Sequence, residues 1–304
     1  MAGFTFADLF CGIGGFHAAC HSLGGRCVLA CDIDQGAREL YRLNWGTMPH
    51  DDIRTLPVIK NIDLLCAGPP CQAFSTIGQR RGTKDARGEL MYVLCDYIAT
   101  AQPKAFIIEN VKALTSARYQ RSFEDILASL RGAGYVVSWQ VLDASDFGAP
   151  QHRERVYITG IRGGGSVGPI RHGKAHRVLA DVLDRVADPG LASHVLDAYI
   201  LPNPQMTPTG FQIIAQKNQY TDGRVFGRAG IIGTILASGP PLVFDGSIIR
   251  HLSIPELRRI QGFPARFKMP VSRTDAGHYF GNAVCVPVVK AVAREVLATL
   301  AKRG

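Results

Sequence analysis

The sequence lacks an apolar stretch long enough to span a membrane, and it shows neither a secretory signal nor an internal repeat. Its eight cysteines lack the paired spacing of zinc ligands. We therefore expect a cytoplasmic protein with reduced thiols, no metal site and no membrane partner. Acidic residues are also few, because 25 of them stand against 34 lysines and arginines, which gives a formal net charge of +9. This excess favours a polyanionic partner, although many basic proteins bind no nucleic acid.

The 304 residues include six short apolar runs that alternate with amphipathic helical patterns. The runs are residues 4–10, 28–31, 62–67, 105–108, 136–142 and 156–161. This alternation predicts an α/β fold with a doubly wound, mostly parallel sheet. After residue 161 the chain becomes rich in glycine, proline and asparagine, which predicts a second, smaller domain.

One cysteine follows a predicted strand in an unusual setting. The run Gly68-Pro69-Pro70-Cys71 comes directly after residues 62–67, so its thiol is expected in a rigid turn at the carboxyl end of a strand. Open α/β sheets bind their ligands at that edge, where a nucleophile can reach a substrate. The alternative interpretation is that Cys71 is a small buried hydrophobe, as free cysteines usually are.

The first predicted strand runs into a glycine-rich turn that contains Gly12 and Gly14. Such a turn lets a nucleotide-like cofactor approach the backbone. The dinucleotide fingerprint requires a further glycine where this chain has His17, which argues against a nicotinamide enzyme. Asp32 and Asp52 follow the next two stretches, where the first could bind ribose hydroxyls and the second an adenine amino group. Either carboxylate could instead cap a helix or a turn.

Further charged groups lie at predicted strand ends. Glu109 follows the strand at 105–108, where a carboxylate could hold or donate a proton, or could cap the next segment. Arg153 and Arg155 are expected on the same face of an extended segment, because side chains alternate along a strand. Their guanidinium groups would then converge on one site, unless they form only a solvated charged edge.

Six motifs, four of which contain residues named above, make the chain resemble the bacterial DNA (cytosine-5)-methyltransferase family. The motifs are Phe10-Cys11-Gly12-Ile13-Gly14, Gly68-Pro69-Pro70-Cys71-Gln72, Glu109-Asn110-Val111, Gln151-His152-Arg153-Glu154-Arg155, Gln261-Gly262-Phe263-Pro264 and Gly281-Asn282-Ala283-Val284. They stand in the family's order, with a long variable insert between the fourth and the fifth. The resemblance implies the Rossmann-like fold of class I S-adenosylmethionine-dependent methyltransferases.

The resemblance also implies a reaction on double-stranded DNA. The family flips a target cytosine out of the duplex, and a Pro-Cys thiolate adds to carbon 6 so that carbon 5 takes a methyl group. Cys71 matches this nucleophile, and Glu109 matches the glutamate that binds ring nitrogen 3 and the exocyclic amine. Arg155 matches the arginine on the cytosine carbonyl oxygen, with Arg153 supporting the site.

The implied cofactor is S-adenosylmethionine, which leaves as S-adenosylhomocysteine. The matching positions are Phe10, Gly12, Gly14, Asp32, Ile33, Asp52, Ile53, Pro70 and Asn282. Where the family often has an aromatic residue that stacks on adenine, this chain has Ile33, which offers an apolar face without a π-system. We therefore expect lower cofactor affinity than an aromatic residue would give.

The resemblance divides the chain into a catalytic and cofactor-binding domain at 1–175, completed by 279–304, and a target-recognition domain with its hinge at 176–278. The glycine- and arginine-rich loop after Cys71 is interpreted as a lid over the flipped base, or as an ordinary surface loop. The residues expected to contact DNA are Ser75, Gln79, Arg80, Arg81, Arg87 and Thr234. We expect a monomer that associates with nucleoid DNA, either beside a separate cognate restriction endonuclease or as an orphan methylase.

Three alternatives share parts of this pattern. A transfer-RNA cytosine-5 methyltransferase uses the same chemistry, but the full-length variable insert favours DNA. An enzyme that methylates an exocyclic amine would carry an aromatic residue after the Pro-Pro pair, where this chain has Cys71. A non-catalytic DNA-binding protein on the same fold would tolerate the loss of Cys71, Glu109 or Arg155, and all three are present.

Overall fold

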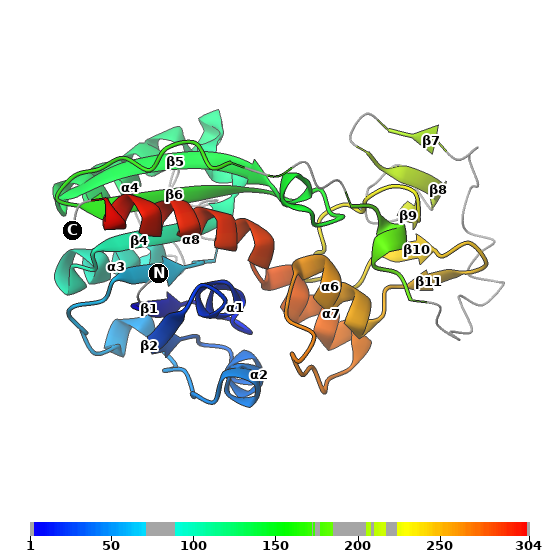
Figure 1. Ribbon diagram of the computed structural model, residues 1–304, viewed down its shortest axis with the longest axis horizontal. Helices are drawn as coiled ribbons and strands as arrows, with labels where there is room; N and C mark the ends of the chain where they lie inside the picture. Colours follow the sequence, from blue (N-terminus) through cyan, green and yellow to red (C-terminus); the bar gives the residue numbers. More distant parts are fainter. Residues whose placement is uncertain are drawn as a thin grey trace, which may run out of the picture. The chain divides into compact units, whose positions relative to one another are not determined.

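The computed structural model describes residues 3–70, 89–171, 173, 177–184, 205–207, 210–216 and 224–302 (Figure 1). Contacts within the chain define two compact units. The first comprises Met1–Leu142, Glu154–Arg171 and Val288–Gly304, and the second comprises Asp143–Arg153 and His172–Pro287. The second unit therefore includes Asp143–Arg153, a segment that the sequence analysis assigned to the catalytic domain.

The first unit is built on a six-stranded sheet with the order β2-β1-β3-β4-β6-β5. Its strands are β1 (Phe4–Leu9), β2 (Gly25–Cys31), β3 (Leu64–Ala67), β4 (Ala105–Val111), β5 (Tyr135–Asp143) and β6 (Glu154–Arg162). The pairs β1–β2, β1–β3 and β3–β4 are parallel, whereas β4–β6 is antiparallel. Each of the six apolar runs in the sequence thus forms a strand of a mostly parallel sheet.

Helices cover both faces of this sheet. They are α1 (Gly15–His21), α2 (Gln35–Trp45), α3 (Glu89–Ala101), α4 (Gln120–Gly132) and α8 (Val286–Ala301), with 3-10 turns at Ile53–Thr55, Lys112–Thr115 and Ala117–Tyr119. Successive residues of β3 point to opposite faces. Leu65 lies in the core cluster with Leu94 of α3 and Ile126 of α4, whereas the Cys66 sulfur is 3.8 Å from that of Cys20 in α1. The predicted doubly wound α/β fold is confirmed.

The second unit contains a five-stranded sheet with the order β11-β10-β9-β8-β7. Its strands are β7 (Gln205–Met206), β8 (Gln212–Gln216), β9 (Arg224–Gly227), β10 (Leu242–Phe244) and β11 (Ile249–His251). The pair β9–β10 is parallel and the other three pairs are antiparallel. Helices α6 (Ile254–Gln261) and α7 (Arg273–Asn282) follow, and 3-10 turns occur at Ala144–Phe147 and Leu179–Asp181. No helix formed by the described residues is long and apolar enough to cross a bilayer.

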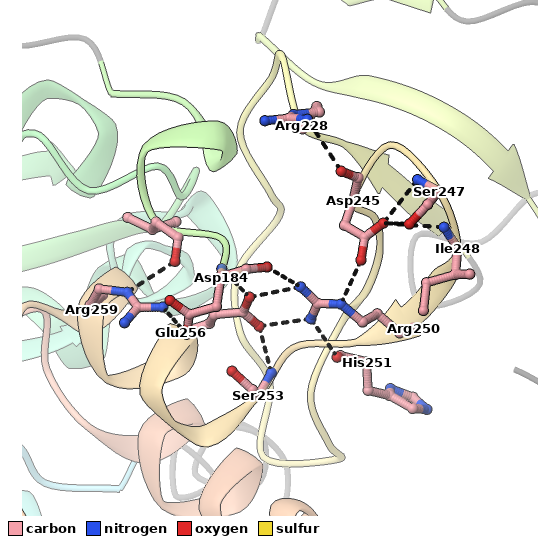
Figure 2. Close-up of polar contacts among 11 residues, drawn as sticks. Asp184, Arg228, Asp245, Ser247, Ile248, Arg250, His251, Ser253, Glu256 and Arg259 are labelled. Atoms are coloured by element: carbon pink, nitrogen blue, oxygen red, sulfur yellow. Dashed lines mark hydrogen bonds and ion pairs between the residues drawn. The ribbon is translucent and has the colours of Figure 1, made fainter. Parts of the chain in front are cut away.

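Arg250 is the buried centre of a polar network in the second unit (Figure 2). Its Nη1 and Nη2 atoms each donate to a carboxylate oxygen of Glu256 at 2.8 Å, and its Nε donates to Asp245 at 3.0 Å. Glu256, itself fully buried, also accepts the backbone N–H groups of Ser253 (2.7 Å) and Asp184 (2.8 Å). The network therefore joins β11, the amino end of α6 and the segment at residue 184.

Both carboxylates of this network are held in their charged form. Burial would raise the pKa of Asp245, but hydrogen bonds from Ser247, Ile248 and Arg250 lower it to about 2. Burial also raises the pKa of Glu256, but hydrogen bonds from Arg250 and from two backbone N–H groups outweigh this effect, so the pKa is lowered. Unfolded Asp and Glu have pKa values of about 4. The pairing therefore stabilises the fold fully above that pH, and the stabilisation is lost as the pH falls toward about 2.

The substitution Arg250→Met is expected to destabilise the second unit by about 3–5 kcal/mol at pH 7, because it leaves two largely buried carboxylates without their cation. Urea denaturation measures this loss, and the difference from wild type should shrink as the pH falls toward 2. Lys104→Met is the control, since it removes the exposed partner of Asp63 in the first unit and should cost less than about 1 kcal/mol. Equal losses in the two variants would contradict this account.

Candidate active site

The turn after β1 carries strained backbone. Phe10 has a φ of +55°, a left-handed conformation that is rare for a bulky residue, and Gly12 has a φ of +51°. A Cβ atom added at Gly12 would meet no other atom within 4 Å, so open space borders the turn there. Backbone strain concentrates at ligand sites, and the turn is therefore a candidate binding surface.

Gly14 lets a side chain of the protein approach the turn closely. A Cβ atom added there would lie 2.2 Å from Nε1 of Trp45, the last residue of α2. Trp45 donates this N–H to the carbonyl of Ile13 at 3.2 Å and stacks on His17, with 4.3 Å between the ring centroids. The close approach that glycine permits at position 14 is thus made by an indole ring of the protein, whereas Gly12 faces open space.

Asp32, directly after β2, holds the turn in place. Its Oδ2 accepts the N–H of Gly12 at 2.7 Å, and its Oδ1 accepts the N–H of Asp34 at 2.9 Å. Burial raises the pKa of Asp32 in spite of these two hydrogen bonds. Asp34 caps α2, with its Oδ1 accepting the N–H of Ala37 at 2.8 Å. The helix-capping role considered for Asp32 therefore belongs to Asp34.

The residues expected beside adenine differ in exposure. Ile33 is 74% exposed, whereas Ile53 is 5% exposed and belongs to the main core cluster. Asp52 caps the 3-10 turn at Ile53–Thr55, where it accepts the N–H of Arg54 at 2.9 Å and pairs with its guanidinium group at 2.9 Å. Asp52 thus has the capping role that the sequence left open as an alternative. Ile33 remains as apolar surface on which a flat ring could lie.

The backbone that leads to the predicted nucleophile is fixed at the end of β3. Asn110, which is buried in β4, donates its Nδ2–H to the carbonyl of Pro69 at 3.1 Å. Pro69 is buried and Pro70 is exposed. Cys71 lies outside the described residues, and so do five predicted DNA contacts, Ser75, Gln79, Arg80, Arg81 and Arg87. Asn110 therefore ties β4 to the segment that immediately precedes Cys71.

Glu109 and Arg155 form an ion pair at the same edge of the sheet. Val111 of β4 is the register partner of Arg155 in β6, so Glu109, two residues earlier, lies on the same face. Nε of Arg155 is 3.2 Å from Oε1 of Glu109, and the two side chains are 16% and 11% exposed. A Cβ atom added at Gly68 would lie 4.0 Å from Oε2. The carboxylate therefore borders the backbone that leads to Cys71.

The Glu109 carboxylate retains unused hydrogen-bonding capacity. Although Arg155 is close, Oε1 is buried and accepts no hydrogen bond from any residue that the structure describes. Buried polar atoms nearly always have hydrogen-bond partners, so such an atom calls for an explanation. A ligand that brings an N–H donor to this edge would satisfy it.

The partners of Arg153 differ from those of Arg155. Its guanidinium group donates, at 2.9–3.3 Å, to three backbone carbonyls, those of Ile235, Gly281 and Ala283. The prediction that the two guanidinium groups converge on one site was therefore wrong. Strand alternation does not extend to Arg153, because β6 begins at Glu154.

Two further predicted site residues make contacts within the second unit. Thr234 donates its hydroxyl to the carbonyl of His152 at 2.9 Å. Asn282, the last residue of α7, has its Nδ2 3.2 Å from Nε2 of His278 in an exposed position. Both side chains are thus positioned by neighbours of their own unit.

Comparison with known proteins identifies the family. The model for "C-5 cytosine-specific DNA methylase" matches residues 4–298. The chain belongs to the C-5 cytosine-specific DNA methylase family. It is 34% identical to Type II methyltransferase M.HpaII of Haemophilus parainfluenzae over 98% of this chain and 90% of that protein. It is 35% identical to Type II methyltransferase M.NlaX of Neisseria lactamica over 98% and 97% of the two chains.

A solved structure shares the fold. The crystal structure of S. pombe Dnmt2 methyltransferase superposes with a TM-score of 0.75 at 19% identity, covering 98% of this chain and 99% of that one. At this identity the likeness shows the fold alone. The family match and the Type II relatives establish this methylase as a DNA cytosine-5 methyltransferase, which confirms the resemblance inferred from the six motifs.

Sequence reasoning missed two residues that shape the candidate site of the methylase. Asn110 could have been found, because it directly follows Glu109 in the third motif. Trp45 could not, because nothing in the sequence near α2 indicates that its ring will lie against Gly14. Such contacts depend on how β1 and β2 bring distant segments together.

Proposed function

We propose that the enzyme transfers a methyl group from S-adenosylmethionine to carbon 5 of a cytosine that is flipped out of a specific double-stranded DNA sequence. One observation carries this proposal. The buried carboxylate of Glu109, with an unsatisfied Oε1, lies beside Arg155 and next to the backbone that leads into Cys71. An acceptor and a cation held together at a strand edge match the edge of a cytosine, which presents an amine and a carbonyl.

In this proposal Glu109 and Arg155 bind and polarise the base. Glu109 accepts hydrogen bonds from the exocyclic amine and from protonated ring nitrogen 3, and Arg155 donates to the carbonyl oxygen. Both groups reduce the free-energy cost of the negative charge that enters the ring when a nucleophile adds. Their ion pair keeps each side chain oriented before the base arrives, so little reorganisation is needed.

Cys71 supplies the nucleophile. Its sulfur bonds to carbon 6 of the ring, and the electron pair displaced from the 5,6 double bond makes carbon 5 nucleophilic. After carbon 5 has gained a methyl group, it loses its proton to a base or to water. The electrons of that C–H bond restore the double bond and expel the thiolate, which leaves 5-methylcytosine and the unchanged cysteine.

The residues around the turn after β1 fit S-adenosylmethionine. Gly12 borders open space, Asp32 presents a carboxylate within reach of hydroxyl groups, and Ile33 exposes an apolar face beside it. When bound, the cofactor supplies a methyl group activated by its sulfonium. We assign Phe10, Gly12, Asp32 and Ile33 to its binding, together with the positions assigned by family resemblance: Gly14, Asp52, Ile53, Pro70 and Asn282. Among these, Gly14 and Ile53 act through packing.

The substitution Asp32→Asn is expected to weaken S-adenosylhomocysteine binding about 10–100-fold, because a charge-assisted hydrogen bond is worth about 1.5–3 kcal/mol. Isothermal titration calorimetry measures this directly. Asp34→Asn is the matched control, since asparagine also caps helices and Asp34 lies outside the assigned site. Wild-type affinity in Asp32→Asn, or equal losses in the two variants, would remove Asp32 from the cofactor site.

The second unit is proposed to read the DNA sequence. We assign target recognition to residues 176–278 with Thr234 among the contacts, and the lid to the loop after Cys71, where Ser75, Gln79, Arg80, Arg81 and Arg87 would contact DNA. The net charge of +9 supports a phosphate-rich partner. We further propose that the enzyme acts as a monomer, either with a separate restriction endonuclease or alone.

Base-resolution methylation mapping tests the proposed function. DNA from cells that express the wild-type enzyme should carry 5-methylcytosine at one short sequence context, and DNA from cells that express Cys71→Ser should not. Purified enzyme should methylate duplex DNA in preference to transfer RNA. Methylation confined to transfer RNA, or its absence from both nucleic acids, would contradict the proposal.

A further inference from the structure

Three polar side chains are buried together in the second unit. Gln151 and Gln261 are fully buried and Arg153 is 3% exposed. Gln151 and Arg153 precede β6, and Gln261 ends α6. Burial of so many polar atoms costs free energy unless each atom has a hydrogen-bond partner. The partners therefore show which backbone segments these side chains fix in place.

Arg153 holds the carboxyl end of α7. The last carbonyls of a helix have no partner within the helix and carry partial negative charge. Arg153 donates to the carbonyl of Gly281 from Nη1 (3.1 Å) and Nη2 (3.2 Å), and to that of Ala283 from Nη2 (2.9 Å). Its charge therefore lies at the favourable end of the helix, and its bonds flank Asn282 on both sides.

The two glutamine amides connect the carboxyl end of α7 to the segment at Ile235. Gln261 donates its Nε2–H to the carbonyl of Phe280 in the last turn of α7. Gln151 donates to Oε1 of Gln261 at 3.3 Å, and its own Oε1 accepts the N–H of Ile235 at 2.8 Å. Arg153 contacts the same segment more weakly, because its Nη1 is 3.3 Å from the Ile235 carbonyl. Ile235 directly follows Thr234, whose hydroxyl is bound to the carbonyl of His152.

The backbone of Arg153 is fixed as firmly as its side chain. Its N–H donates to Oδ1 of Asp143 at 3.1 Å, and its carbonyl accepts the N–H of Ala144 at 3.1 Å. Hydrogen bonds thus fix both the backbone of Arg153 and its guanidinium group. Its Nη1 and Nη2 atoms are committed to carbonyl groups of the protein.

We propose that Arg153 is a positioning residue that sets the backbone around Asn282, and that Gln151 does the same for the Thr234-Ile235 segment. Arg153 then acts on cofactor binding through Asn282, and Gln151 acts on DNA binding through Thr234. Neither side chain contacts the target base. This inference rests on the proposed function, which assigns Asn282 to the cofactor and Thr234 to DNA.

Two conservative substitutions separate these roles. Arg153→Lys keeps the charge but cannot donate to both carbonyls that flank Asn282 with a planar fork. Gln151→Met keeps the volume but leaves the Ile235 N–H without its acceptor. We expect Arg153→Lys to raise the dissociation constant of S-adenosylhomocysteine about 10-fold and that of duplex DNA less than 3-fold. For Gln151→Met we expect the dissociation constant of duplex DNA to rise about 10-fold and that of S-adenosylhomocysteine less than 3-fold. At saturating DNA and cofactor, kcat of Arg153→Lys should fall less than about 5-fold.

Calorimetry, a DNA-binding titration, single-turnover rates and thermal melting of the full-length variants provide these values. A kcat loss above 100-fold with unchanged affinities would place Arg153 on the base and overturn the proposal. A lower melting temperature with wild-type affinities in both variants would also overturn it, because the contacts would then serve stability alone. Binding constants do not depend on turnover, so an inactive wild-type enzyme would contradict the proposed function and leave this test intact.

Discussion

Replacing Cys71 with serine is expected to lower methyl transfer by about 10⁴-fold or more, with DNA binding retained. The thiol of cysteine has a pKa of about 8.5, so a useful fraction is thiolate when the site favours that form. A serine hydroxyl is far harder to ionise and adds poorly to carbon 6. The rate is measured by transfer of a labelled methyl group to duplex DNA, and the affinity by a gel-shift titration.

Cys95→Ala is the matched control for this substitution. Cys95 is 2% exposed in α3, and burial raises the pKa of its thiol to about 11, which suits a packing role. Replacing Cys95 with alanine should change the transfer rate less than about 3-fold, because it leaves only a small cavity and removes no group that takes part in methyl transfer. Full turnover by Cys71→Ser would remove position 71 from the mechanism, whereas loss of activity in both variants would indicate a general effect on folding.

The substitution Glu109→Gln is expected to slow the single-turnover rate by about 10²–10³-fold with the fold intact, because it removes one charged partner from the transition state. Glutamine has the same shape as glutamate, but its neutral amide cannot stabilise a proton on ring nitrogen 3. The ion pair with Arg155 is lost as well, so that cation is no longer oriented. Rapid-quench measurement of methyl transfer tests this prediction.

Glu154→Gln provides the comparison. Glu154 is adjacent to Arg155 in β6 and pairs with Lys112 through an exposed ion pair. It offers the same chemical change outside the candidate site, and the rate should stay within about 3-fold of wild type. Unchanged single-turnover rates in Glu109→Gln would count against its role at the base.

The strands, and the approach of Glu109 to the segment before Cys71, could be predicted from the sequence because their signals are local. The apolar run at 62–67 contains β3, and the run at 105–108 contains the start of β4. Parallel pairing of β3 with β4 then brings the segment before Cys71 next to Glu109. The face on which Arg155 lies follows instead from its register partner Val111 in β4, and the sequence alone does not give this pairing.

Contacts between distant segments could not be predicted. Arg153 binds carbonyls that lie 82 to 130 positions away, and nothing within its own motif distinguishes it from Arg155. Gly14 looks like a ligand-binding glycine, and only the position of Trp45 shows that it admits an indole. Periodicity determines which face a side chain occupies, whereas its partner depends on the tertiary fold.

The covalent bond between sulfur and base is the central claim, and duplex DNA containing 5-fluorocytosine tests it most directly. Fluorine at carbon 5 cannot leave as a proton does, so elimination stops after methyl transfer and the enzyme stays attached. Incubation with S-adenosylmethionine followed by peptide mapping should locate the DNA on Cys71. Under conditions that support turnover on normal DNA, the absence of an adduct, or its location on another residue, would contradict the account.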